Sequence, residues 1–442
     1  MTDLITRKPS DWDIKNLENI ATFITKGATP TTYGFEWVEE SSDSIPFLRS
    51  ECVTANGFNR KGMNFISKKA HVTMGRSKIK SGDILMTITG NIGRIATLPD
   101  EIPEANINQH IAKISVIDGV SSSYVAQALQ QERYNRYYER ILTGQAYPQI
   151  SLKQVRETPI LLPPHPEQQK IAEVLSTVDK KIALIDQKIA ETEKLKTGLM
   201  QKLFLEGVGV QDENGEWQPH TEFQDSPFGK IPQPWSTLEL AEIADIEDGD
   251  RGKSYPKQAD FSDFGYCLFL SAKNVTKQGF SYRTTQFISQ EKHNKLRKGQ
   301  VLQNDIVLTT RGTVGNFGLF KNEELFDAVR INSGMAIIRC IDSSMPNYLY
   351  QFMQSPQFKA QISKVVFGSA QPQLTIKQIK KFKVLVPPSE EKKWIEETLK
   401  LANDKLTLLE QQKAETQQLK KGLMQKLLTG EWRVPVEETE AA

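Results

Sequence analysis

Apolar residues recur at alternating steps of four and three positions along one segment near the middle of the chain. The seam consists of Ile171, Leu175, Val178, Ile182, Ile185, Ile189, Leu199 and Leu203. This spacing is a heptad pattern, which predicts an amphipathic helix over about 166–206, roughly 60 Å long. Thr192 and Lys196 stand at seam positions before the last two leucines, so we expect the hydrophobic contact to loosen there.

A second segment near the C-terminus carries the same pattern with the same interruptions. Its seam consists of Ile395, Leu399, Ala402, Leu406, Leu409, Leu423 and Leu427, with Thr416 and Lys420 at the weak positions. A lone helix with one apolar stripe needs a partner in water, and the two matching seams indicate that these helices pack on each other. We expect an intramolecular antiparallel pair; a parallel coiled coil between two copies of the chain is the alternative.

Between the helical segments, the pattern changes to short β-branched runs bounded by glycine. The segments 83–89 and 305–310 are the clearest, and each leads into a Gly-rich turn. These runs predict strands, so each helix is preceded by a section of about 150 residues with mixed, mainly β character. The fold class is therefore α+β, with two globules and two long antiparallel coiled-coil helices.

The whole chain is a tandem repeat with an offset near 224 positions. The hexapeptide Gly-Leu-Met-Gln-Lys-Leu occurs at 198–203 and again at 422–427, and the proline pair at 163–164 recurs at 387–388. Farther upstream Trp12 faces Trp235, at an offset of 223. A period this long indicates a duplicated pair of domains with pseudo-two-fold symmetry and not a solenoid of short repeats. We expect a first globule at 1–160, a central helix at 161–207, a second globule at 208–384, a C-terminal helix at 385–430 and a tail at 431–442.

Charge is distributed unevenly along the 442 residues. The net charge is +2, but 20–160 holds 16 Lys and Arg against 13 Asp and Glu, and 236–382 holds 19 against 14. The globular parts therefore carry +3 and +5, which leaves −6 for the rest, a pattern that suits a polyanion facing two separate patches. No segment has the apolar length of a membrane span or a signal peptide, so we expect a cytoplasmic protein with no membrane partner.

Motifs for catalysis or metal binding do not stand out. The segment 249–254 resembles the tail of a phosphate-binding loop, but Glu247 occupies the position of its first glycine. The five histidines show no metal-ligand spacing, and no G-x-G-x-x-G loop follows a strand. We therefore expect no catalytic residue, no metal site and no cofactor in this chain.

Taken together, these motifs resemble the specificity subunit of type I restriction-modification enzymes. The resemblance rests on Pro-Pro-x-x-Glu-Gln at 163–168 followed by Ile171 and Ala172, on the Gly-x-x-x-Pro-Gln turns that begin at Gly144 and Gly368, and on the two helix-end hexapeptides. It extends from Trp12 to about Trp432. The second copy departs at Lys392, which replaces the glutamine.

The resemblance implies a division of labour between subunits. Each globule, as a target recognition domain, would recognise one half of a bipartite, asymmetric DNA site, and the helices would set the spacer and dock two methyltransferase subunits. Two restriction subunits would join them. S-adenosylmethionine, ATP and Mg would then be used by the partners.

Direct contacts with DNA require polar and basic side chains on loops. In the first globule the candidates are Arg49, Arg60, Lys61, Arg76, Lys78, Asn91, Arg94 and Tyr147, and in the second they are Arg251, Lys253, Lys273, Arg283, Arg297, Lys298 and Arg311. The alternative function is a freestanding DNA-binding scaffold or anti-restriction regulator that works without catalytic partners.

Overall fold

The computed structural model describes residues 4–5, 8–143, 148–321, 325–366 and 372–435. They divide into two compact units, Met1–Asp186 with Gln411–Ala442, and Gln187–Glu410. Each unit therefore contains one globule and one half of each long helix. No helix in the described ranges has the length and apolar character needed to cross a membrane.

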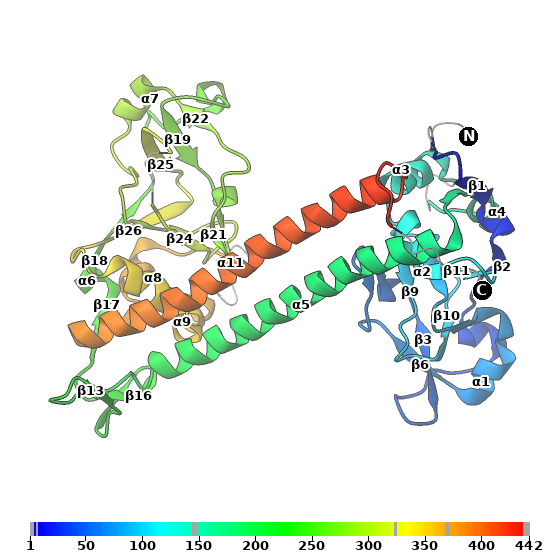
Figure 1. Ribbon diagram of the computed structural model, residues 1–442. Helices are drawn as coiled ribbons and strands as arrows, with labels where there is room; N and C mark the ends of the chain where they lie inside the picture. The colour runs from blue at the N-terminus through cyan, green and yellow to red at the C-terminus, as the bar shows by residue number, and fades with distance from the viewer. Residues whose placement is uncertain (1–3, 6–7, 144–147, 322–324, 367–371, 436–442) are drawn as a thin grey trace. The chain divides into compact units, whose positions relative to one another are not determined.

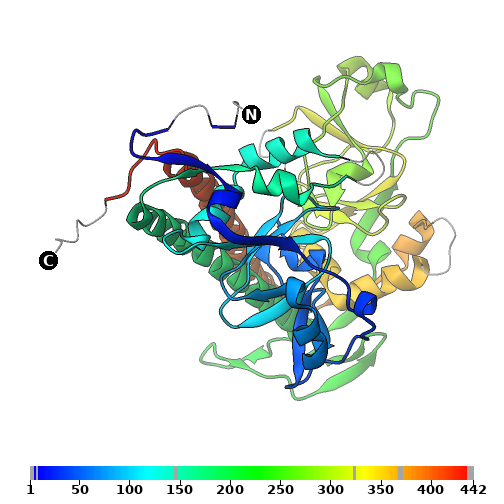
Figure 2. The ribbon, with the colours of Figure 1, turned by 90° about the vertical axis from the view of Figure 1, so that its right-hand side faces the viewer.

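Two four-stranded sheets form the globule of the first unit (Figures 1 and 2). One is antiparallel, in the order β2 (Ala21–Lys26), β11 (Ile111–Val116), β8 (Ile84–Thr87) and β9 (Ile95–Thr97). The other has the order β6 (Asn64–Ser67), β3 (Ser44–Leu48), β10 (Glu104–Ile107) and β7 (Lys78–Lys80), with β3 and β10 parallel. All four residues of β8 are buried, which explains its continuous apolar run.

Smaller elements complete the first globule. They are the β1 (Asp13–Asn16) and β12 (Pro159–Leu162) pair, the β4 (Val53–Thr54) and β5 (Gly57–Phe58) hairpin, and the helices α1 (Lys68–Thr73), α2 (Ser122–Leu129), α3 (Glu132–Ile141) and α4 (Leu152–Arg156). Ser67, Ser121 and Ser151 each cap a helix by accepting a backbone N–H with the side-chain hydroxyl.

The globule of the second unit repeats this topology, except that an isolated bridge between Gln300 and Arg330 stands where β7 pairs with β10. Its antiparallel sheet has the order β18 (Ala244–Asp248), β26 (Met335–Cys340), β23 (Ile306–Thr309) and β24 (Phe317–Leu319). Its second sheet has the order β22 (Phe287–Ile288), β19 (Cys267–Leu270) and β25 (Ala328–Ile331), with β19 and β25 parallel. The duplication seen in the sequence is thus also a duplication of strand order.

Further short elements surround this second globule. They are the strand pairs β13 (Val210–Gln211) with β14 (Trp217–Gln218), β15 (Phe223–Ser226) with β16 (Gly229–Pro232), β17 (Ser236–Glu239) with β27 (Lys383–Val386), and β20 (Val275–Thr276) with β21 (Gly279–Phe280). The helices are α6 (Leu240–Ile243), α7 (Gln290–Lys295), α8 (Pro346–Gln354), α9 (Pro356–Val366) and α10 (Ile376–Lys380).

The two long helices are α5 (His165–Leu203) and α11 (Ser389–Leu427), and they run antiparallel. Within the first unit, Lys413 forms an ion pair with Asp186 at 2.6 Å and Lys420 forms one with Asp179 at 2.7 Å. From Asp179 to Asp186 the chain advances by seven positions, and their partners go back by seven, from Lys420 to Lys413. The two helices therefore run in opposite directions. The α+β fold with an intramolecular antiparallel helix pair is confirmed.

The ends of both seams reach into the cores of the globules. Ile171 and Leu175 share a buried cluster with Leu423 and Leu427 in the first unit, and Leu199 and Leu203 share one with Ile395 and Leu399 in the second. Ile185 and Leu409 are buried in the middle of the helices. Val178, Ile182, Ile189 and Leu406 are half-buried.

The expected loosening of the seam is wrong at Thr192 and Thr416, and it is not contradicted at Lys196 and Lys420. Both threonines are buried, and each hydroxyl donates to the carbonyl four residues earlier in its helix. The lysines leave the seam with their amino groups. Lys196 donates to Gln354 of α8 at 2.8 Å, and Lys420 donates to Gln130 beside α2 at 3.4 Å. These positions therefore connect the helices to the globules.

Candidate nucleic-acid interface

Strand register brings five loops of the second globule to one edge of its sheets. Asp248 pairs with Ala336 and Thr309 pairs with Met335, so the ends of β18 and β23 lie beside the start of β26. In the other sheet, the parallel strands β19 and β25 end together. The loops that leave these ends are 249–254, 271–274, 310–315 and 332–334, and the turn 296–299 after α7 joins them.

Hydrogen bonds tie these loops into one surface. The guanidinium of Arg251 donates to the carbonyl of Ser333 at 3.2 Å, and the backbone N–H of Arg311 donates to the carbonyl of Gly334 at 3.2 Å. Gly249 packs so tightly that a Cβ there would lie 2.2 Å from the carbonyl oxygen of Asn332. Only glycine permits this approach.

A buried carboxylate organises the basic part of this surface. Asp250 accepts the backbone N–H of Gly252 at 2.6 Å and that of Arg297 at 2.8 Å. Burial opposes ionisation of Asp250, but these backbone donors and the nearby guanidinium outweigh it and hold its pKa below the usual value. Asp248 lies 3.6 Å from Arg251 and 3.5 Å from Lys298, so it partly balances the exposed cations.

All seven predicted residues of the second globule are exposed. The loop contacts bring Arg251, Lys253, Arg297, Lys298 and Arg311 together at this edge. Lys273 follows Ala272, whose Cβ would lie 3.9 Å from a Cβ added to Gly312, and Arg283 lies on a segment bound to Asn274 through two carbonyls. The segment 249–254, which resembled a phosphate loop, is one of the loops of this surface.

The first globule presents the equivalent edge with different side chains. Lys26 pairs with Ala112, Thr87 pairs with Ile111, and the parallel strands β3 and β10 end together at Leu48 and Ile107. The loops that follow these strands carry Arg49 and Asn91, both exposed.

Most of the other predicted residues of the first globule lie on segments outside these loops. Arg60 and Lys61 are exposed on the loop after β5, where Gly62 packs against Glu51. Arg76 lies on the turn after α1, and Lys78 is the half-buried first residue of β7. Arg94 is half-buried at the end of the turn that also carries Asn91, where Gly93 packs against α3, and Tyr147 lies outside the described residues.

Sequence reasoning missed a polar group at the first loop edge. Thr29 donates to Gln109 at 2.7 Å, and Thr89 lies 2.5 Å from the Nδ1 atom of His110. Gln109 and His110 stand between two strands in sequence, immediately before a buried apolar run. That position is the signal that could have identified them.

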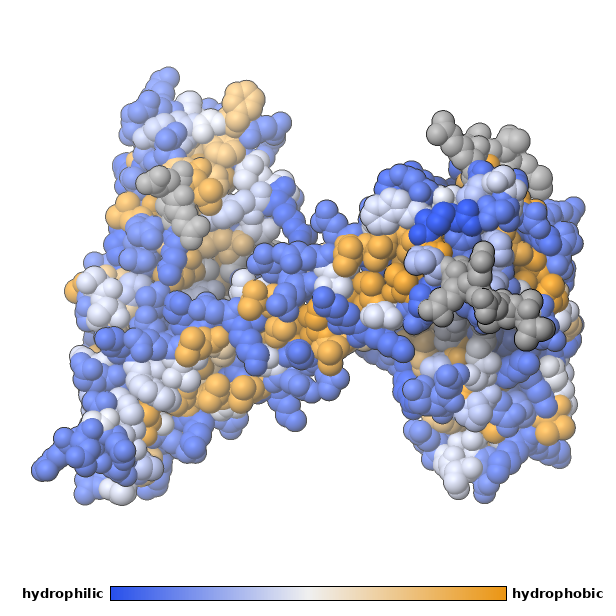
Figure 3. All heavy atoms as spheres, viewed as in Figure 1, coloured by the Kyte–Doolittle hydropathy of each residue, from blue (hydrophilic) through white to orange (hydrophobic). Residues whose placement is uncertain are grey.

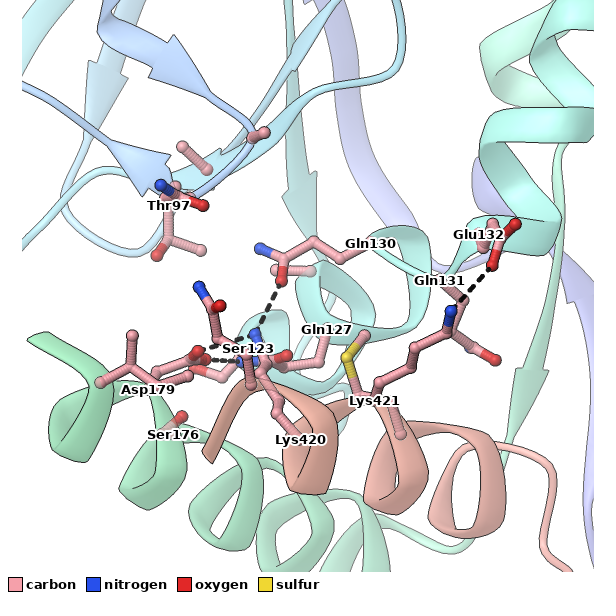
Figure 4. A pocket seen from close by; sticks show the side chains of 18 of the residues that line it. Thr97, Ser123, Gln127, Gln130, Gln131, Glu132, Ser176, Asp179, Lys420 and Lys421 are labelled. Atoms are coloured by element: carbon pink, nitrogen blue, oxygen red, sulfur yellow. Dashed lines mark hydrogen bonds and ion pairs between the residues drawn. The ribbon is translucent and has the colours of Figure 1, made fainter. Parts of the chain in front are cut away.

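A cavity of about 1030 Å³ lies in the first unit between the globule and the helix halves (Figure 4). Lys420 sits between Asp179 and Gln130 in its wall, and Gln127 donates to Asp179 at 2.7 Å. The Oε1 atom of Gln127, a residue only 7% exposed, accepts no hydrogen bond from a described residue. The residue 224 positions later, Gln351, has the same unpaired atom in the second unit.

The proline-pair motif ends at a buried glutamate in both repeats. Glu167 accepts the Trp12 indole N–H at 3.0 Å and the Arg433 guanidinium, and Glu391 accepts the Trp235 indole N–H at 2.7 Å. After Glu167, Gln168 accepts the N–H of Ser121 at 2.9 Å. In the second repeat Lys392 stands in place of this glutamine, and its amino group donates to Ser344 at 2.7 Å. The contact to the serine that precedes the short helix, α2 or α8, is therefore kept with a different side chain.

Comparison with known proteins places these features in a family. The family model described as "Type I restriction modification DNA specificity domain" matches residues 9–194 and 232–418. The MjaVIII specificity subunit of a type I restriction enzyme from Methanocaldococcus jannaschii is 27% identical over 434 residues, covering 97% of this chain and 94% of that protein. The putative MjaX specificity subunit of the same organism is 26% identical and covers 96% of this chain and 95% of that protein.

Solved structures show the same fold. The type I restriction-modification S subunit from M. genitalium has a TM-score of 0.56 at 16% identity, with coverage of 97% of this chain and 99% of that chain. A chain from a structure of a type I R-M system also has a TM-score of 0.56 at 16% identity, covering 96% and 100%. With two matched copies that span most of its length, the chain belongs to the type I restriction-modification DNA specificity domain family.

Proposed function

We propose that this chain is the DNA sequence-specificity subunit of a type I restriction-modification complex, in which each globule recognises one half of a bipartite, asymmetric site. The observation that carries the proposal is the duplicated loop edge. The backbone frame is the same in both globules, but Arg251 and Arg311 of the second stand where the first has Thr29 and Thr89. Different donors and acceptors on one frame are what recognition of two different half-sites requires.

Replacing one globule by a copy of the other tests this directly. Because the repeats are related by pseudo-two-fold symmetry, a chain in which residues 208–384 are replaced by a second copy of 1–160 is expected to methylate a palindromic site that contains the first half-site twice, as an inverted repeat. Sequencing of methylated positions in DNA from cells with the complete system provides the measurement. An unchanged methylation pattern would refute recognition by the globules.

The helices are proposed to set the spacer between the half-sites. An added heptad in each helix, after Gln187 in α5 and after Gln411 in α11, keeps the seam facing its partner and lengthens the pair by about 10 Å. That is the rise of roughly three base pairs of duplex DNA. The mapped target is expected to gain about three base pairs between its half-sites, and an unaltered spacer would contradict this role.

Two methyltransferase subunits are proposed to dock on the helices. Exposed leucines support this arrangement, because Leu184 and Leu195 of α5 recur 224 positions later as Leu408 and Leu419 of α11, and all four are more than half exposed. Figure 3 shows apolar residues on the surface of the long helices. Each unit carries one leucine from each helix, so the same partner surface is offered twice.

Co-purification distinguishes this function from a freestanding scaffold or regulator. Wild-type chain is expected to retain two methyltransferase subunits, and Leu184→Asp with Leu419→Asp is expected to retain one. Gln187→Asp is the matched control on the exposed surface of α5. Methyl transfer, cleavage and the use of S-adenosylmethionine, ATP and Mg are assigned to the partners, with restriction subunits completing the complex. A chain that methylates DNA alone would overturn this non-catalytic role.

A further inference from the structure

Each globule buries a histidine of its short helix against a polar residue of its parallel strand. In the second globule, Arg330 of β25 donates through Nε to the Nδ1 atom of His293 in α7 at 3.1 Å, and both residues are less than a tenth exposed. In the first globule, the Nδ1 atom of His71 in α1 lies 2.5 Å from the Oδ1 atom of Asn106 in β10. The histidines are 222 positions apart and their partners 224, so both pairs occupy the same place in the repeat.

The strand residue of each pair also holds the turn that follows the short helix. Arg330 donates to the carbonyl of Leu296 at 3.1 Å and to that of Lys298 at 2.8 Å. Asn106 donates to the carbonyl of Met74 at 3.4 Å and to the hydroxyl of Ser77 at 2.6 Å. Met74 and Leu296 are again 222 positions apart. The same backbone point is therefore fixed from inside both globules.

These turns carry basic residues that the sequence predicts as DNA contacts. Arg297 and Lys298 follow Leu296, and Arg76 follows Met74 by two positions. The backbone of Arg297 is held from the other side as well, because its N–H donates to the Asp250 carboxylate. The exposed side chains therefore start from a backbone with little freedom.

Burying an arginine at position 330 costs free energy, and the three hydrogen bonds that its planar side chain donates offset part of that cost. A buried guanidinium loses hydration, and Asp250 and Glu247 act on Arg330 only through longer-range electrostatics, with no carboxylate of the described ranges in a direct ion pair with it. The planar guanidinium can, however, donate to three acceptors in fixed directions. Here those acceptors are one imidazole and two backbone carbonyls of the basic turn.

We propose that His293 with Arg330, and His71 with Asn106, are positioning residues for DNA recognition that orient the basic turns 296–298 and 74–78 toward the phosphate backbone. This inference rests on the proposed function. A turn held in its bound conformation before binding loses less conformational entropy when phosphates are contacted. The two repeats use the same device with different strength, since Arg330 fixes two carbonyls and Asn106 only one.

The test is the salt dependence of DNA binding by the full chain assembled with its methyltransferase partners. The probe is a duplex of mixed sequence, about 40 base pairs long so that it spans well over one footprint, and the dissociation constant is measured over a range of salt concentrations. Three variants are compared with wild type: Arg297→Ala with Lys298→Ala, which removes the basic side chains; Arg330→Gln, which releases the turn; and Lys393→Ala, a control on the exposed surface of α11. Stoichiometric titration gives the active fraction of each.

The slope of log K against log salt is negative. Removing the two side chains is expected to decrease the magnitude of this slope by about 0.9 for each phosphate that the protein no longer neutralises. Arg330→Gln is expected to decrease the magnitude of the slope by about the value for one phosphate. It is also expected to weaken binding roughly fivefold with an unchanged active fraction. A decrease in stability alone would reduce the active fraction and leave the slope of the remaining molecules as it was. Lys393→Ala is expected to match wild type.

Three results would distinguish failure of the positioning role from failure of the proposed function. A lowered slope on removal of the side chains, together with a wild-type slope for Arg330→Gln, would overturn the positioning role and leave the proposed function standing. A wild-type slope for both variants would show that the turn does not contact DNA and would overturn the inference alone. Failure of the wild-type complex to bind DNA would refute the proposed function itself.

If Arg330→Gln does not fold, the first globule carries the same test. Asn106→Ala removes the hydrogen bond to the carbonyl of Met74, and Arg76→Ala with Lys78→Ala removes the basic side chains of that turn and of the strand residue that follows it. A lowered slope for Asn106→Ala supports the proposal, and a wild-type slope beside a lowered slope for the removal variant overturns it.

Discussion

Glu391 at the start of α11 provides the sharpest prediction for stability. Its carboxylate is 2% exposed and accepts four hydrogen bonds, from Trp235 Nε1 at 2.7 Å, His220 Nε2 at 2.9 Å and the backbone N–H groups of Val208 and Gly209 at 2.7 and 3.2 Å. The change Glu391→Ala would leave these donors without an acceptor in a buried site. Because breaking a buried charged interaction costs about 3–5 kcal/mol, we expect a decrease of that size in the free energy of unfolding.

Thermal unfolding followed by tryptophan fluorescence measures this decrease. For a unit of this size, each kcal/mol corresponds to about 2–4 °C, so the midpoint of the Glu391→Ala variant is expected to fall by roughly 6–20 °C. Glu391→Gln keeps the shape and one acceptor oxygen and should fall between that variant and wild type. The matched control is Glu390→Ala, at an exposed position, with an expected change within about 0.5 kcal/mol. Equal midpoints for Glu391→Ala and Glu390→Ala would refute the reasoning.

Three other perturbations follow from the structure. Arg433→Ala removes the guanidinium that donates to the buried Glu167 at 2.6 Å; since the arginine itself is half exposed, urea denaturation should show a smaller decrease in stability, on the order of 1–2 kcal/mol. Burial, and then the guanidinium of Arg330, lower the pKa of His293, so the unfolded chain binds a proton more readily; stability is expected to be full above about pH 6.5 and to fall below it toward the folded pKa, an effect that His293→Gln should abolish in midpoints measured between about pH 7.5 and 5.5. Gly249→Ala places a Cβ 2.2 Å from a backbone carbonyl oxygen and should cost on the order of 3 kcal/mol in the same urea assay, whereas a neutral result would show that the loops of the second globule are not packed as described.

The heptad seams show how far periodicity reaches as a predictor. The spacing of Ile171, Leu175 and their successors was enough to predict two long helices, because a 3.5-residue apolar repeat can be buried only along one helical stripe. Single residues were harder. Thr192 and Lys196 looked like weak points, but a threonine hydroxyl satisfied within its own helix is compatible with burial, and the lysine leaves the seam for a glutamine 158 positions away.

The candidate DNA contacts show the opposite limit. Arg297 and Lys298 could be selected from sequence as exposed basic residues on a turn, and so could Arg94, which is half-buried. Residue type alone does not distinguish them. Their placement depends on which strand ends lie side by side, and that is a property of sheet register.

By itself, the sequence determined the duplication, the two long amphipathic helices and the mixed β character of the globules, because each of these is written in local spacing or in similarity between two parts of one chain. The tertiary structure alone decided which loops meet at one edge, and that His293 and Arg330, 37 positions apart, form one buried contact. The physical reason is that helix formation depends on residues a few positions apart, whereas burial of a polar group is tolerated only where partners from distant segments satisfy its hydrogen bonds.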